Sequence, residues 1–118
     1  MISNFSKEIH KDVIVEIVEL SRATVKESQE FKSILTEDIE NNFLKFVVDF
    51  EDCEFIDSTF LSTLVTTLKY LIKKGGNLKL SSISSEVQSL LELTGTNRVF
   101  EIYKNKKEAV QSYTDNNN

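Results

Sequence analysis

The chain has 118 residues, 40% of them hydrophobic and 28% charged, and a formal net charge of −5 at pH 7. This length suits one domain around one core, and the acidic balance disfavours nucleic acid and anionic lipid surfaces as partners, so we expect protein partners. The single cysteine, Cys53, and the single histidine, His10, provide neither an internal disulfide nor a metal site between them.

Strand and helix patterns alternate along the first half of the chain. Residues 2–8 are a weak strand candidate, and residues 13–20 (VIVEIVEL) are a clear β-branched one, so we expect an antiparallel pair joined by a polar break at 10–12. Residues 24–41 have the apolar spacing of a helix, with a stripe of Phe31, Ile34, Leu35 and Ile39. Residues 43–50 (FLKFVVDF) are almost continuously apolar, which indicates a strand buried on both faces at the centre of a sheet.

The most regular helical pattern follows a short acidic turn. If Ser58 caps this helix, the apolar side chains occupy one arc of about 140°: Phe60, Leu61, Leu64, Val65, Leu68, Leu71 and Ile72. The opposite face is polar, and Gly75 and Gly76 end the helix. We expect Leu61, Leu64, Leu68 and Ile72 to pack against the sheet.

The remaining segments complete an alternating α/β order. Residues 77–82 alternate as a strand, Ser85 and Gln88 form a capping box for a helix that stops at Gly95, residues 98–103 are a last strand, and residues 106–113 a short helix. The order β-β-α-β-α-β-α-β-α predicts a mixed, mostly parallel sheet of four to five strands with about four helices. We expect one domain over residues 1–113 and a disordered tail over 114–118.

The sequence also favours a cytoplasmic location. No apolar run reaches the roughly 18 residues of a membrane span, and the N-terminal MISNFSKEIHKD is too polar for the apolar part of a signal peptide. We therefore expect no direct membrane insertion, and a monomer or weak dimer.

Catalytic motifs are sparse. A serine or cysteine nucleophile needs a base, but His10 lies in a predicted turn and Cys53 is interpreted as a packing residue. Three glycines cannot build a phosphate-binding loop. The carboxylate pairs Asp49/Glu51 and Asp52/Glu54 are interpreted as a solvated turn. We expect no catalytic residue, no metal and no cofactor.

One short segment, residues 57–59, is a candidate functional site. Asp57, Ser58 and Thr59 are three consecutive residues that favour helix N-termini, and they stand at a strand-to-helix junction where a cap needs only one of them. Physical chemistry alone favours simple capping, since strand-to-helix turns often have this composition. A functional role for the extra residues stays open on these grounds.

Residues 46–103 resemble the STAS family, and specifically its bacterial anti-sigma factor antagonists. The family pattern is matched by Asp49, Phe55, Asp57-Ser58-Thr59, Leu61, Gly75-Gly76 and Val99-Phe100-x-Ile102. The N-terminal part matches only in topology and length. The resemblance implies the STAS fold and a protein that binds partners and catalyses nothing.

The resemblance also implies a phosphorylation-gated switch that regulates transcription. In such antagonists the serine after the aspartate, here Ser58, is phosphorylated by an anti-sigma factor that is also a serine kinase of the GHKL type. The unmodified form binds that factor and frees the sigma factor, and a PP2C-type phosphatase resets the system. Phe60 and Ser62 stand where many members have glycine, so we expect Phe60 to be half-buried or to be an aromatic contact for the partner.

The expected partner-binding face begins at the phosphoacceptor. On a helical wheel Ser58, Ser62 and Lys69 fall within about 40° of one another with Thr66 beside them. The complete set of expected partner-binding residues is Asp57, Ser58, Thr59, Phe60, Ser62, Thr66 and Lys69.

Two alternatives stay open beside the switch. A STAS domain also serves as a non-phosphorylated scaffold or as the cytoplasmic subunit of a lipid-transport ATPase complex. A more remote alternative is a small acidic α/β enzyme, for which the discriminating observation is a deep polar pocket with strongly shifted pKa values.

Overall fold

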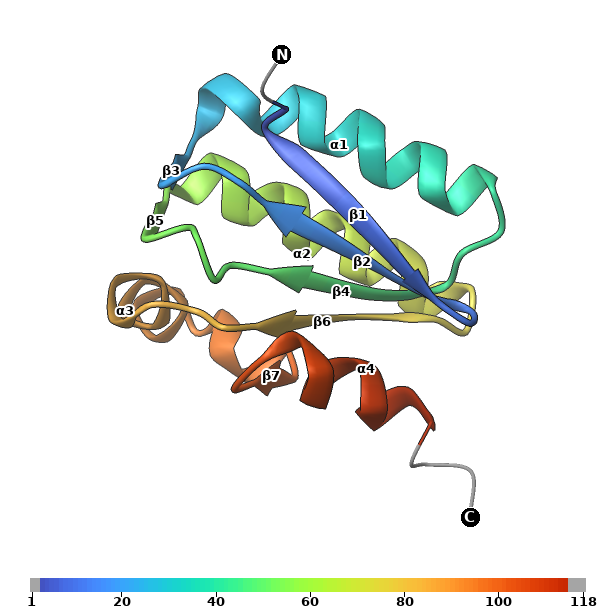
Figure 1. The fold of residues 1–118 in the computed structure, drawn as a ribbon. Coiled ribbons are helices and arrows are strands. Elements are labelled where there is room, and N and C mark those ends of the chain that lie inside the picture. Colours follow the sequence, from blue (N-terminus) through green and yellow to red (C-terminus); the bar gives the residue numbers. More distant parts are fainter. Residues whose placement is uncertain (1–2, 115–118) are drawn as a thin grey trace.

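A mixed sheet in the order β1-β2-β4-β6-β7 runs through the centre of the molecule (Figure 1). The computed structural model describes residues 3–114. The five strands are β1 (Phe5–His10), β2 (Val13–Val18), β4 (Lys45–Asp49), β6 (Asn77–Ser81) and β7 (Ile102–Tyr103). Strand β1 pairs antiparallel with β2, and the other pairs are parallel. The predicted antiparallel pairing of the first two strands and the central place of segment 43–50 are confirmed.

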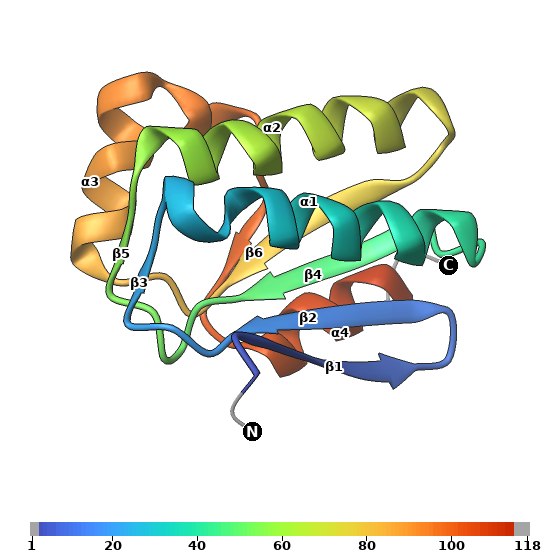
Figure 2. The same ribbon diagram turned by 90° about the horizontal axis from the view of Figure 1, so that it is seen from above.

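Helices cover both faces of this sheet. Helices α1 (Val25–Glu40) and α2 (Ser58–Lys73) lie side by side on one face, and α4 (Lys106–Thr114) lies on the other (Figure 2). Helix α3 (Ser85–Thr94) sits at one end of the sheet and leads into a short 3-10 helix, Thr96–Arg98. The predicted α/β class, with a five-stranded sheet and four α-helices, is confirmed for the described residues.

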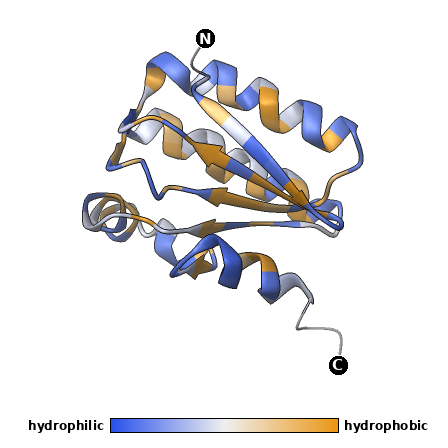
Figure 3. Cartoon of the chain, in the orientation of Figure 1, coloured by the Kyte–Doolittle hydropathy of each residue, from blue (hydrophilic) through white to orange (hydrophobic). Residues whose placement is uncertain are grey.

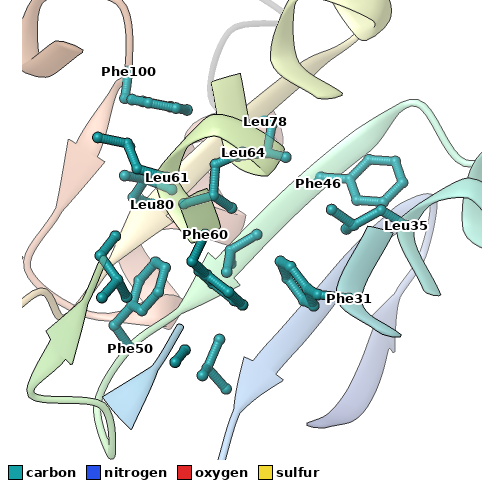
Figure 4. Close-up of a cluster of buried hydrophobic side chains, with 14 of the residues drawn as sticks. Phe31, Leu35, Phe46, Phe50, Phe60, Leu61, Leu64, Leu78, Leu80 and Phe100 are labelled. Carbon is teal, nitrogen blue, oxygen red and sulfur yellow. The ribbon is translucent and has the colours of Figure 1, made fainter. Parts of the chain in front are cut away.

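The central strands are apolar because both of their faces are covered. Strands β2 and β4 are largely hydrophobic along their length, whereas the helices are striped (Figure 3). Phe46 and Val48 point into the larger core under α1 and α2, while Val47 joins Val13, Val15 and Ala109 of α4 in a smaller one. Figure 4 shows the larger core, where side chains from α1, α2 and the sheet meet.

The apolar face of α2 differs from the one expected. Leu61, Leu64 and Leu68 are buried as predicted, but Ile72 is 57% exposed. Thr67, which lies outside the predicted apolar arc, is buried, and its hydroxyl donates to the carbonyl of Thr63 at 2.8 Å. The reason is that α2 packs against α1 as well as the sheet, so its buried arc is rotated toward α1.

Several boundaries also shift. Helix α3 is capped by Ser84, whose Oγ accepts from the Val87 amide at 3.1 Å, so the capping box expected at Ser85 and Gln88 is wrong. The strand expected over 98–103 shortens to Ile102–Tyr103, because Arg98 belongs to the 3-10 helix and the amides of Val99 and Phe100 donate to the Thr96 carbonyl in the turn that follows. Two short strands, β3 (Arg22–Ala23) and β5 (Phe55–Ile56), pair with each other and were not expected.

The ends of the chain bear on two further expectations. Thr114 ends α4, so the helix includes the first residue of the expected tail. Residues 115–118 and the first residue of the expected strand 2–8 lie outside the described residues. Within residues 3–114, no helix combines the length and apolar character that crossing a membrane requires.

Candidate functional site

Asp57 fixes the N-termini of both helices on one face of the sheet. Its Oδ1 accepts a hydrogen bond from the Phe60 amide at 2.9 Å, which caps α2. Its Oδ2 accepts from the Val25 amide, the first of α1, also at 2.9 Å. One carboxylate therefore satisfies free donors of two helices and holds their N-terminal ends together. The parallel pair β3–β5, which leads into these helices, places the two ends side by side.

Ser58 is the first residue of α2 and does not cap it, so the expected cap moves to Asp57. The side chain of Ser58 is exposed. Its hydroxyl makes no hydrogen bond with any residue in 3–114, and the same holds for the backbone amides of Ser58 and Thr59. The hydroxyl thus faces solvent beside two unpaired donors at the positive end of a helix dipole.

Phe60 is the one expected partner contact that the fold contradicts. Its side chain is 0% exposed and stacks with Phe31 at a centroid distance of 5.0 Å and with Phe5 at 6.4 Å. Phe60 points from α2 toward Phe31 in the core (Figure 4). Both expectations, a half-buried ring and an aromatic contact for a partner, are wrong, because α1 and β1 cover this ring.

The other expected residues do form one surface. Ser58, Thr59, Ser62, Thr66 and Lys69 are all exposed, whereas Asp57 is half-buried. Beside them lies a hollow of about 260 Å³ between α1 and α2, lined by Ser28, Gln29, Lys32, Thr59, Ser62, Thr63, Thr66 and Thr67. The residues of α1 in this hollow had no signal in the sequence, because their place depends on how the two helices pack.

The acidic turn before the site is only partly solvated. Asp49, at the end of β4, is buried and accepts hydrogen bonds from the hydroxyls of Ser81 at 2.7 Å and Ser82 at 2.9 Å. Interpreting Asp49 as part of a solvated turn was therefore wrong, since it joins the ends of β4 and β6. Glu51, Asp52 and Glu54 are exposed as expected.

Neither of the single reactive residues is arranged for chemistry. Cys53 is buried, and burial raises the pKa of its thiol, which is the behaviour of a packing residue. His10 lies at the exposed end of β1, with Nε2 at 3.0 Å from Glu8 Oε1. Among residues 3–114, no three His, Cys, Asp or Glu side chains gather in a way that would hold a metal ion.

The fold and the junction at Ser58 can now be compared with known proteins. Residues 4–109 match the family model of the STAS domain. The chain belongs to the STAS domain family. The match covers the sheet and three of the four α-helices completely, and it extends the resemblance noted for residues 46–103 across the N-terminal strands.

Relatives of this STAS domain are named as anti-sigma factor antagonists. The anti-sigma-B factor antagonist of Bacillus subtilis is 34% identical over 61 residues, which are 52% of this chain and 56% of that protein. A Thermotoga maritima protein, provisionally named an anti-sigma factor antagonist, is 28% identical over 108 residues, which are 91% of this chain and 95% of the relative. The chain thus matches about half the length of the first relative and nearly all of the second.

Solved structures have the same architecture. The crystal structure of TM1081 of T. maritima has a TM-score of 0.82 at 27% identity and covers 92% of each chain. Unphosphorylated SpoIIAA, an anti-sigma factor antagonist, has a TM-score of 0.83 at 16% identity and covers 97% of this chain and 99% of its own. The likeness to SpoIIAA concerns the fold alone.

Proposed function

We propose that this STAS domain is an anti-sigma factor antagonist whose partner binding is switched off by phosphorylation of Ser58. The names of its relatives supply the class of function. The observation that carries the choice of residue is the exposed hydroxyl of Ser58, which makes no hydrogen bond within residues 3–114 while Asp57 does the capping. A serine that caps a helix would be occupied, whereas this one is available to a kinase.

The fold has the means to tolerate a phosphate at this position. A phosphoserine adds about −1.5 to −2 charges at pH 7. The unpaired amides of Ser58 and Thr59 and the positive end of the α2 dipole stabilise such an anion. The neighbouring Asp57 is also negative, but both of its oxygens already accept amide hydrogen bonds. Modification should therefore leave the domain folded.

The same phosphate should disrupt an interface on this surface. A dianion inside a close-packed contact must lose its water, and that desolvation is costly unless the partner supplies matching cations. A loss of about 3 kcal/mol weakens binding roughly a hundredfold, which suffices for a switch. The modified form would release its partner and the unmodified form would hold it.

The proposed partners follow from the same function. The anti-sigma factor acts as a GHKL-type serine kinase, a PP2C-type phosphatase removes the phosphate, and the released sigma factor regulates transcription in the cytoplasm. The STAS domain contributes no catalytic residue, no cofactor and no metal to this cycle. Asp57 acts in it as a positioning residue, while Ser58, Thr59, Ser62, Thr66 and Lys69 face the partner.

The remote enzyme alternative gains no support from the described residues. An acid/base enzyme needs a carboxyl group with a shifted pKa in an accessible pocket. The pKa of Glu16 is raised to about 8 because this carboxyl is buried. Glu16 is fully buried beneath α1 and does not line the hollows beside α1 and α2 described for residues 3–114. The scaffold alternatives use the same surface without phosphate, so the experiment below separates them from the switch.

Phosphate transfer tests the proposal directly. Unmodified protein would be used to capture partners, and a captured serine kinase would be purified and incubated with the STAS domain and ATP. We expect one phosphate on Ser58, full labelling of the control Thr59→Ala, and none of Ser58→Ala, which should keep its partner constitutively. Capture of a transporter subunit without any phosphate transfer would instead support the scaffold and overturn the switch.

A further inference from the structure

An apolar groove runs along the side of α2 that faces away from α1. It encloses about 350 Å³ between the C-terminal half of α2 and residues 94–99. Its apolar walls are Val65, Leu68, Ile72 and Val99. Ile72 is 57% exposed and Val99 54% exposed, although both are large hydrophobic side chains.

The groove exists because the apolar stripe of α2 is wider than the surface that covers it. The helix packs against the sheet and against α1, which leaves the edge of the stripe that carries Ile72 outside the core. On the other wall, the 3-10 helix turns the chain so that Val99 faces solvent while Phe100 enters the core. Single exposed apolar residues are ordinary, but here two of them line one concave surface.

The charge in the groove is positive, unlike that of the chain as a whole. Lys69 is the only charged residue that lines it, and no carboxylate does. The complete chain carries a net charge of −5. An apolar surface beside an isolated lysine is complementary to an apolar segment that carries a carboxylate.

The groove also adjoins the phosphoacceptor surface. At 100° per residue Lys69 lies about 20° from Ser58 around α2, and Ile72 about 40° from Ser58 on the other side. Along the helix axis, Ser58 and Ile72 are roughly 21 Å apart at 1.5 Å per residue. A partner helix of about four turns, laid along α2, reaches both ends of this surface.

We propose that this groove anchors an acidic, amphipathic segment of the anti-sigma partner. An apolar side chain of that segment inserts between Ile72 and Val99, and a neighbouring carboxylate pairs with Lys69. The inference rests on the proposed function and assigns separate roles to the two ends of α2: the groove supplies affinity, and Ser58 controls occupancy. Binding energy concentrates in such desolvated apolar anchors more than in the exposed polar contacts around them.

Affinity measurements with a matched control test this assignment. The probe is the purified anti-sigma factor identified by its phosphate transfer to Ser58, and the variants are Ile72→Ser, Val99→Ser and Lys69→Glu. Ile9→Ser is the control, because Ile9 lies on the far edge strand and is 58% exposed, against 57% for Ile72. We expect each of the three groove variants to bind at least about tenfold more weakly, and the control within about twofold of wild type.

The outcomes separate this inference from the function on which it rests. If Ile72→Ser and Val99→Ser bind like wild type while Ser58 still accepts phosphate and gates binding, the groove assignment is overturned and the switch stands. If no kinase transfers phosphate to Ser58, the proposed function fails and the inference fails with it. If sedimentation shows a wild-type dimer that Ile72→Ser dissociates, the occupant is a second copy of this chain and the assignment to the anti-sigma factor is wrong.

Discussion

Glu16 of β2 and Asp38 of α1 bring two carboxyl groups together in the interior of the protein. Their side chains are 0% and 2% exposed, and Nζ of Lys7 lies 3.2 Å from Glu16 Oε2 and 2.8 Å from Asp38 Oδ1. Burial, followed by the neighbouring Asp38 carboxyl, raises the pKa of Glu16 to about 8, although Lys7 lowers it. At neutral pH the buried Glu16 carboxyl therefore holds a proton, and the Lys7 ammonium lies against both carboxyl groups.

The raised pKa of Glu16 predicts a pH dependence of stability. The pKa of Glu16 is 4.5 in its ordinary state and about 8 in the folded protein, so between these values the folded state binds more protons than the unfolded state. The free energy of unfolding should then fall as pH rises through this window, by up to about 1.4 kcal/mol per pH unit. Glu16→Gln should remove this slope and be more stable than wild type at pH 9.

Urea unfolding at pH 6, 7, 8 and 9 measures this difference. The difference between Glu16→Gln and wild type cancels the titration of groups that do not contact Glu16, since these behave alike in the two proteins. The charged groups that face Glu16 are Lys7 of β1 and Asp38 of α1. Equal pH slopes for the two proteins would contradict a raised pKa of Glu16 in the folded state.

The packing of α2 predicts opposite results for two neighbouring apolar residues. Leu68 is 2% exposed and Ile72 57% exposed, although both belong to the same predicted stripe. Leu68→Ala should lower the free energy of unfolding by roughly 2–5 kcal/mol, because it leaves a cavity between α2 and the sheet. Ile72→Ala should cost less than about 1 kcal/mol, as exposed substitutions do. Similar losses for both, measured by chemical denaturation, would show that the core includes Ile72.

These two residues illustrate what the sequence predicts and what it does not. Periodicity and β-branched runs predict the order of elements, the central strand and the polar stripe from Ser58 to Lys69, because those patterns follow from one helix or strand at a time. The burial of Phe60 and the exposure of Ile72 depend on where α1 packs, which no single-helix pattern contains. The pairing of Glu16 with Asp38 depends on contacts between residues distant in the chain, although a glutamate inside the run VIVEIVEL is itself a signal.

Because Asp57 accepts amide hydrogen bonds from both helices, its substitutions should lower the free energy of unfolding by graded amounts. Asp57→Ala removes acceptors from the N-termini of α1 and α2 together, and at roughly 1 kcal/mol per cap it should cost about 2 kcal/mol. Asp57→Asn keeps an oxygen for the Phe60 amide but presents an amino group to the Val25 amide, so its loss should be intermediate. Thermal or urea unfolding would measure the series, and equal stability of Asp57→Asn and wild type would contradict a role at α1.

The proposed switch predicts that binding and stability respond differently to a negative charge at the start of α2. Ser58→Asp places a carboxylate beside the free amides of Ser58 and Thr59, where an acidic residue stabilises a helix by about 0.3–1 kcal/mol, so its melting temperature should equal or slightly exceed that of wild type. Its affinity for the anti-sigma partner should nevertheless fall by about a hundredfold, because the charge must be desolvated in the interface.

Ser85→Asp is the matched control for this charge. Ser85 is also an exposed first residue of a helix, α3, with its cap supplied by the preceding Ser84. The added carboxylate replaces a hydroxyl that donates to Glu86 Oε1 at 3.2 Å, so the melting temperature should equal or fall slightly below that of Ser58→Asp, while affinity stays unchanged because Ser85 lies outside the proposed surface of α2. Calorimetric titration of both variants with the purified kinase measures the contrast. Full binding by Ser58→Asp, together with phosphate found on Thr59 or on no residue, would show that the proposed gate at Ser58 is wrong and that the scaffold describes this protein better.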